Sequence, residues 1–145
     1  MAAWAGQLPH RDDLILESIP GISQVTALCL LGELGDLRRF RNPNALNAFV
    51  SVDLRHYESG KLVLSGHISK RGDALARKLL YHSIGQIEAA SRTQPCRIAD
   101  YYDKRKRSSQ ARSFKKIAIA AVHKLLRTVY HLIKFDQTYD YNVVS

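Results

Sequence analysis

Cysteine, methionine and tryptophan are scarce in this 145-residue sequence, which has two, one and one of them. The two cysteines, Cys29 and Cys96, form no CxxC pair and cannot build a disulfide framework or a zinc ribbon. The six histidines also lack the spacing to cysteines or acids that metal ligands show. We therefore predict no metal or cofactor site within this chain.

Long apolar runs are absent as well. No segment approaches the roughly 18 consecutive apolar residues of a membrane span, so we expect no membrane partner. The N-terminus, MAAWAGQLPHRDD, has no charged region followed by an apolar core, which is the pattern of a signal peptide. Together the two absences favour a cytoplasmic protein.

Acidic residues are few, and they are unevenly placed. Residues 1–54 contain four Lys or Arg and six Asp or Glu, whereas residues 55–145 contain eighteen and seven. The second part therefore carries a net charge of +11. Such an asymmetry indicates a polyanion, nucleic acid above all, as the partner of the C-terminal two-thirds. A soluble protein with a basic surface is the alternative.

Hydrophobic periodicity predicts a mainly α fold of five or six helices, interrupted by one irregular Gly- and Ser-rich insertion at about 51–72. Ser23, Asn42 and Asp73 are suited to cap the second, third and fourth helices. Residues 1–13 form a flexible lead-in, and residues 135–145 form a tail without periodicity. The expected helices are 12–19, 24–34, 43–50, 74–91, 97–107 and 110–134.

The stretch Ile19-Pro20-Gly21-Ile22-Ser23 lies between the first two helices and is typical of a helix-hairpin-helix. Glycine permits a tight turn, and the first N–H groups of the second helix have no partner within the helix. They can hold one DNA phosphate without reading bases, which makes Gly21, Ile22 and Ser23 candidate DNA contacts. Alternatively, the Pro-Gly pair only separates two core helices.

The insertion contains "HYESGKLVLSGHISKRGD" (56–73), which combines hydroxyls, glycines and cations. It is either a solvated loop or a site that brings a serine hydroxyl to a phosphate. A serine needs a base or a metal to become a nucleophile. His56, Glu58 and His67 lie near in sequence and could move a proton. Developing charge on the phosphate could be neutralised by Lys70, Arg71 and Arg77.

A second set of candidate phosphate contacts lies on the later helices. It comprises Lys78 and the cations of the 97–107 helix, RIADYYDKRKR: Lys104, Arg105, Lys106 and Arg107. Two tyrosines are interleaved with these cations. Tyr101 and Tyr102 either stack on exposed bases or pack inward against the core.

Four blocks follow one another in order: IPGISQVTALCLLGELGDLRRF, ALNAFVSVDLRHYESG, ISKRGDALARKLLY and KKIAIAAVHKLLRTVYHLI. Over residues 14–134 the chain resembles the C-terminal transposase domain of insertion-sequence recombinases related to the Piv invertase, which are DEDD/RuvC-like, bridge-RNA-guided serine recombinases. The resemblance divides the domain into a hairpin part (14–50), a serine loop (51–73) and basic helices (74–134).

The resemblance implies that Ser59, in Tyr57-Glu58-Ser59-Gly60, attacks a DNA phosphate, with Ser65 and Ser69 as alternatives. It implies DNA as a partner, and it admits a guide RNA, a DEDD-domain chain or segment, and further copies of the chain. In the complete family enzyme Mg²⁺ is held by acids of an N-terminal domain. Residues 1–13 hold no counterpart of those acids, so we expect a chain that binds DNA but does not recombine it alone.

Three other interpretations remain open from the sequence. The chain is alternatively a non-catalytic nucleic-acid-binding protein, or the remnant of a truncated transposase, or a helical oligomerisation module.

Overall fold

The computed structural model describes residues 11–50, 70–108 and 114–143. Within these ranges the chain is helical and contains no strand, which confirms the mainly α prediction. No helix among the described residues combines the length and the hydropathy that a membrane span requires. The elements in chain order are α2 (Asp12–Glu17), α3 (Gln24–Leu34), the 3-10 turn η1 (Leu37–Arg39), α4 (Pro43–Phe49), α7 (Lys70–Ala90), α8 (Arg97–Arg107) and α9 (Phe114–Lys134).

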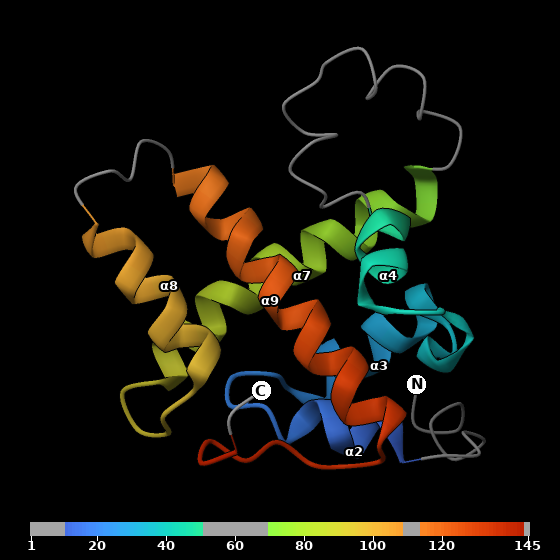
Figure 1. Ribbon diagram of the computed structural model, residues 1–145, viewed down its shortest axis with the longest axis horizontal. Helices are drawn as coiled ribbons and strands as arrows, with labels where there is room; N and C mark the ends of the chain where they lie inside the picture. Colours follow the sequence, from blue (N-terminus) through green and yellow to red (C-terminus); the bar gives the residue numbers. More distant parts are fainter. Residues whose placement is uncertain (1–10, 51–69, 109–113, 144–145) are drawn as a thin grey trace.

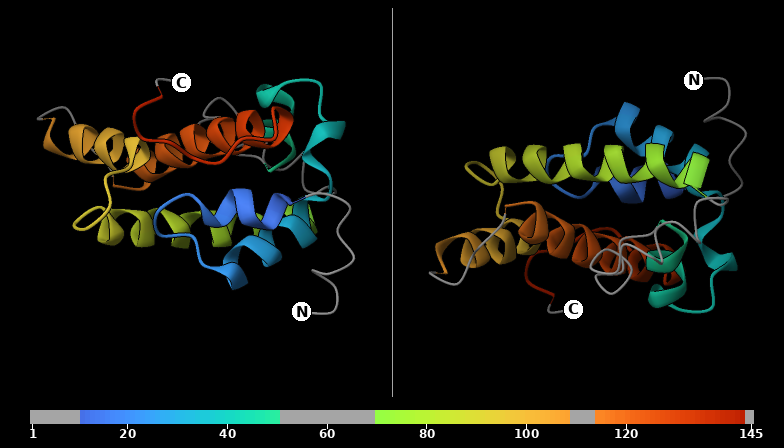
Figure 2. Two further views of the ribbon diagram at one scale, coloured as in Figure 1. Left: turned by 90° about the horizontal axis from the view of Figure 1, so that it is seen from below. Right: turned by 90° about the horizontal axis from the view of Figure 1, so that it is seen from above.

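The helices lie in two layers (Figures 1 and 2). One layer holds α4, α8 and α9, with α9 between the other two, and the second holds α2, α3 and α7. Helix α9 packs on α8, α4 and η1 and crosses α7, so it is the centre of its layer. An apolar stripe of α9 faces the space between the layers. It is buried at Ile117, Ala121, Val122, Leu125, Leu126, Val129 and Ile133.

Two of the predicted helix starts are confirmed in atomic detail. The Ser23 side chain accepts a 3.2 Å hydrogen bond from the backbone N–H of Thr26, and this caps α3. Asn42 accepts a 2.8 Å bond from the N–H of Ala45 and caps α4. These side chains satisfy N–H groups that have no partner inside their helices.

The predicted start of the fourth helix is wrong. Helix α7 begins at Lys70, so Asp73 lies inside the helix instead of capping it. Lysine and arginine are good helix formers, and a single interior glycine costs only about 1 kcal/mol. Lys70, Arg71 and Gly72 therefore extend the helix instead of ending the insertion. Residues 51–69 and 109–113 lie outside the described residues.

The C-terminal segment is packed despite its lack of periodicity. We call residues 135–143 the C-terminal strap. The N–H of Tyr139 donates a 2.8 Å hydrogen bond to the Ser18 hydroxyl at the end of α2. The phenolic oxygen of Tyr139 accepts a 2.7 Å bond from the N–H of Arg97, the first residue of α8. The strap thus joins one layer to the other.

Candidate nucleic-acid interface

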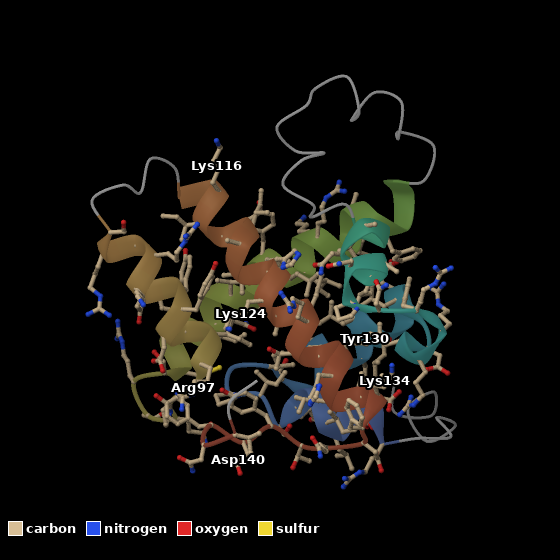
Figure 3. All side chains as sticks on the ribbon, viewed as in Figure 1. Arg97, Lys116, Lys124, Tyr130, Lys134 and Asp140 are labelled. Carbon is tan, nitrogen blue, oxygen red and sulfur yellow. The ribbon has the colours of Figure 1, made fainter. Side chains whose placement is uncertain are left out.

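The C-terminal end of α8 presents cations to solvent. Lys104, Arg105 and Arg107 are exposed there. Cations at this position interact favourably with the negative end of the helix dipole. Lys116, also exposed, lies near the start of α9, beside this end of α8 (Figure 3). We call Lys104, Arg105, Arg107 and Lys116 the α8 end.

Lys106 differs from its neighbours on α8. Its ammonium forms an ion pair with Glu88 of α7 and lies 4.0 Å from Asp103 and 4.7 Å from the centre of the Tyr102 ring. The hydrogen bond to Glu88 raises the pKa of Lys106. Because its charge is compensated within the protein, Lys106 holds α8 on α7 and contributes less to the external field than Lys104 does.

The two tyrosines of α8 have different environments. Tyr102 is half-buried and packs against the core, as the inward-packing alternative expects. Tyr101 is half-buried as well, and its ring lies beside two cations. Lys124 Nζ of α9 is 5.3 Å from the ring centre, and the Arg105 guanidinium is 5.8 Å from it.

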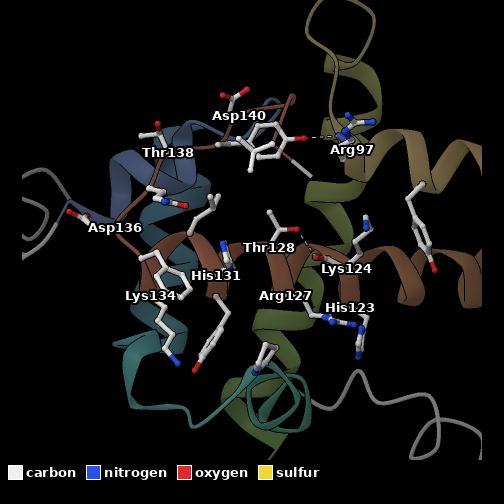
Figure 4. A pocket seen from close by; sticks show the side chains of 18 of the residues that line it. Arg97, His123, Lys124, Arg127, Thr128, His131, Lys134, Asp136, Thr138 and Asp140 are labelled. Carbon is white, nitrogen blue, oxygen red and sulfur yellow. Dashed lines mark hydrogen bonds between the residues drawn. The ribbon is translucent and has the colours of Figure 1, made fainter. Parts of the chain in front are cut away.

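A groove of about 1120 Å³ runs along the exposed side of α9 (Figure 4). Its lining includes Tyr101 and Arg97 of α8, the C-terminal strap, and Pro43 at the start of α4. Among the described residues, five Lys or Arg side chains line it against two aspartates, so this lining carries a net positive charge. The cations are Arg11, Arg97, Lys124, Arg127 and Lys134.

Sequence reasoning missed this groove. One signal in the sequence marks it: Lys124, Arg127, His131 and Lys134 recur at spacings of three and four residues, which places them along one face of α9. The opposite face carries the buried stripe. What could not be foreseen is that the strap provides a wall beside that face.

Arg97 is held rigidly at the groove. Its Nε donates a 3.0 Å hydrogen bond to the carbonyl of Tyr141, and its guanidinium lies 4.1 Å from the centre of the Tyr141 ring. The Tyr141 hydroxyl in turn donates a 2.7 Å bond to Asp100. Stacking and hydrogen bonding together fix the plane of the guanidinium.

The predicted hairpin contacts lie in the other layer, at the turn between α2 and α3. Gly21 has φ +97° and packs closely on α7. The Ile22 side chain is buried, and its N–H donates to the carbonyl of Ile19 at 3.1 Å. Ser23 is exposed and caps α3. The packing of this turn accounts for Gly21 and Ile22, and DNA contact by the three residues stays a prediction.

The remaining predicted residues lie on α7 or belong to the insertion. Arg77 donates a 3.4 Å hydrogen bond to the carbonyl of Val50, so the end of α4 lies beside the first turns of α7. Lys78 is exposed on α7, and Lys70 and Arg71 lie in the first turn of that helix. Ser59, together with Ser65 and Ser69, lies outside the described residues.

The described residues contain no group of three or more His, Cys, Asp or Glu side chains that could hold a metal ion.

Comparison with known proteins adds evidence of descent. The model of the family described as "Transposase IS116/IS110/IS902 family" matches residues 13–103, which run from α2 through most of α8. The chain is 40% identical over 74 residues to the transposase for insertion sequence element IS1111A of Coxiella burnetii, a match covering 50% of this chain and 20% of that protein. It is 29% identical over 128 residues to a probable family 20 transposase of Pseudomonas aeruginosa, covering 86% of this chain and 36% of that protein.

The matched region thus spans only about a fifth to a third of the length of these curated relatives. No solved structure matches the chain.

Proposed function

The chain belongs to the IS116/IS110/IS902 transposase family, and on that premise we propose that it is a DNA-binding module for DNA transposition and site-specific recombination. The observation that carries this proposal is the α8 end. Its four exposed cations gather at neighbouring ends of two helices in a chain of net charge +9. Such a cluster suits the phosphates of a DNA duplex.

The α8 end would bind the phosphate backbone without reading sequence. Lys and Arg side chains that neutralise phosphates release condensed counterions, so affinity falls with salt. Lys104 and Arg107 are the central contacts of the proposal because both are exposed. Ser23, exposed at the start of α3, adds a second phosphate contact in the opposite layer.

The catalytic half of the proposal assigns the nucleophile to Ser59, on the resemblance of its Ser-Gly dipeptide to the family's. In this step the Ser59 oxygen forms a bond to the phosphorus of a DNA phosphodiester. The bond from that phosphorus to one deoxyribose oxygen breaks, the hydroxyl proton passes to a general base, and the leaving oxygen takes up a proton. One phosphodiester replaces another, so the linkage is retained for religation.

The same resemblance supplies the proposed partners. They are a DEDD-domain chain or segment that holds Mg²⁺, a guide RNA, and further copies of the chain. Mg²⁺ stays a prediction for the complete family enzyme.

Duplex binding is tested by fluorescence anisotropy over a salt series. The double variant Lys104→Ala/Arg107→Ala removes two proposed phosphate contacts, which should lower the slope of log K against log salt by about 1.8. The matched control Arg41→Ala/Arg92→Ala removes two exposed charges away from the α8 end, and its slope should stay near that of the wild type. Equal slopes for the two double variants would refute the role of the α8 end.

Nucleophilic catalysis is tested by trapping a covalent protein–DNA adduct. The chain is combined with a DEDD segment, Mg²⁺, guide RNA and donor and target DNA. Ser59→Ala should abolish the adduct, whereas Ser65→Ala and Ser69→Ala should retain it. An adduct that persists in Ser59→Ala refutes the assignment. Intact duplex binding with no adduct in the wild type favours the non-catalytic nucleic-acid-binding alternative.

A further inference from the structure

We propose that the α9 groove is a binding site for a single strand of nucleic acid, separate from the duplex surface at the α8 end. This inference does not depend on duplex binding or on the Ser59 chemistry. It rests on the volume of the groove, the track of cations along it and the aromatic rings near the ends of that track.

The volume suits a polymer segment. At about 1120 Å³ the groove exceeds the roughly 300–1,000 Å³ of pockets that hold small molecules. Its sides come from three separate parts of the chain: the C-terminal strap, the start of α8 and Pro43 (Figure 4). We expect these sides to keep a duplex from the α9 face, whereas a single flexible strand can reach that face between them.

The cations form a track of suitable length. Lys124, Arg127, His131 and Lys134 follow one face of α9 over ten residues, or about 15 Å at 1.5 Å per residue. Phosphates of a stacked strand lie about 3.4 Å apart along its axis, so the track spans about four nucleotides. Arg127 and Lys134 are exposed, and their charges face solvent.

Aromatic rings lie near both ends of this track. Phe135, 57% exposed, lies beside Lys134 in sequence, and its ring centre is 4.7 Å from that of His131. Near the other end, Lys124 Nζ is 5.3 Å from the centre of the Tyr101 ring. A basic track combined with aromatic faces is how proteins bind unpaired bases without strong sequence preference.

The two acids of the groove offset only part of its positive charge, because Asp136 is paired with one of the five cations and Asp140 leaves the other four in excess. Asp136 is paired with Arg11, whose Nε lies 3.3 Å from its carboxylate. Asp140 accepts a 2.9 Å hydrogen bond from the N–H of Asn142. Both belong to the strap, so they would repel phosphates from that wall and direct the backbone of the strand toward α9.

The test uses fluorescein-labelled dT12, U12 and a 12-base-pair DNA duplex, with binding measured by anisotropy over a salt series. Arg127→Ala/Lys134→Ala should weaken dT12 and U12 binding by about tenfold or more and lower the salt slope by about 1.4. Its duplex affinity should stay within about twofold of the wild type. The matched double variant Lys104→Ala/Arg107→Ala should show the reverse pattern.

A second variant probes stacking without a change of charge. Phe135→Ala should weaken binding of the single strands at least fivefold and leave the salt slope unchanged. If the variant instead disrupted the fold of the groove, phosphate contacts would be lost as well and the salt slope would fall. Thermal unfolding of each variant verifies the fold. With dT12 bound, Lys124 and Lys134 should be protected from amine acylation, and Lys104 should not.

The inference is overturned if the wild type does not bind dT12 or U12, or if the groove variants bind both as the wild type does. It is also overturned if both double variants weaken strands and duplex equally, since that outcome means one shared surface. A wild type that binds the single strands but does not bind the duplex refutes the proposed α8-end function alone. Comparison of dT12 with U12 tells which sugar the groove prefers.

Discussion

A Cβ atom added to Gly21 would lie 2.6 Å from the Cα of Ile87, so the turn between α2 and α3 touches the backbone of α7. This relationship changes the interpretation of the Pro-Gly motif. The glycine permits a positive φ of 97°, and it also permits two backbones to meet with no side chain between them.

The Gly21→Ala variant should be strongly destabilised, by about 3 kcal/mol or more, because positive φ alone costs roughly 1–2 kcal/mol and the backbone contact adds to it. Gly35→Ala is the matched control. Gly35 also has positive φ, but its added Cβ would meet only the Arg39 side chain, at 3.7 Å. Urea unfolding measures the free energy of unfolding of both variants. Equal losses would show that the close approach to α7 does not contribute to the destabilisation of Gly21→Ala.

The Tyr139→Phe variant should lose about 1–3 kcal/mol, because it leaves the N–H of Arg97 without its phenolic acceptor in a partly buried site. Tyr141→Phe removes an exposed hydroxyl that bonds to Asp100 and should change stability by less than about 0.5 kcal/mol. Chemical denaturation at neutral pH compares the two. A larger loss in Tyr141→Phe would contradict the role assigned to the strap.

Tyr139 should also make stability depend on alkaline pH. Burial raises its pKa to about 12, above the roughly 10 of an unfolded chain. The unfolded state therefore loses this proton first, and the stability contribution present below pH 10 is lost as pH rises toward 12. The free energy of unfolding should fall more steeply over this window in the wild type than in Tyr139→Phe. If the free energy of unfolding fell equally with pH in the two proteins, Tyr139 would not be the source of the dependence.

Arg38→Ala should cost about 2 kcal/mol or more. Its guanidinium donates two hydrogen bonds to Asp12, at 2.9 and 3.0 Å, and Asp12 is buried. Without the arginine a buried carboxylate loses its partner. Arg11→Ala, which breaks a pair with Asp136 that is more than half exposed on both sides, should cost no more than about 0.5 kcal/mol. Thermal unfolding compares the stability of the two variants. Similar losses of stability would contradict the larger contribution assigned to the Arg38–Asp12 pair.

Lys104 and Lys106 lie on the same helix and should behave differently. Lys104→Ala should lower the salt slope of duplex binding by about 0.9 and leave stability unchanged. Lys106→Ala should cost roughly 0.5–1 kcal/mol of stability, since it breaks the ion pair with Glu88, and should alter duplex affinity by less than about twofold. Anisotropy and urea unfolding distinguish them. Equal effects on affinity would show that Glu88 does not compensate Lys106.

Local signals in the sequence predicted much of the fold. The Ser23 and Asn42 caps and the apolar stripe of α9 are read from spacing alone, because helix ends and amphipathic faces depend on residues a few positions apart. The start of α7 was mistaken, because a plausible cap at Asp73 competes with helix formers that precede it. The segment that contains Ser59 lies outside the described residues, so its role rests on resemblance.

The candidate site was predicted less completely, and the reason is long-range packing. The α8 cations are a visible cluster in the sequence, but the sequence does not show that Lys106 is paired across to Glu88. Nor does it show that the strap forms a wall of the α9 groove, since Tyr139 meets Ser18 and Arg97 from 121 and 42 positions away.

Composition and short spacing thus predict the helices and the positive charge of the C-terminal two-thirds, and the order of the four blocks carries the family resemblance. The packing of the helices is what shows which cations remain exposed, where a groove forms and why Gly21 is needed. Those properties arise when distant segments meet. A contact such as that of Gly21 with Ile87 cannot be inferred from the residues that surround either position in the sequence.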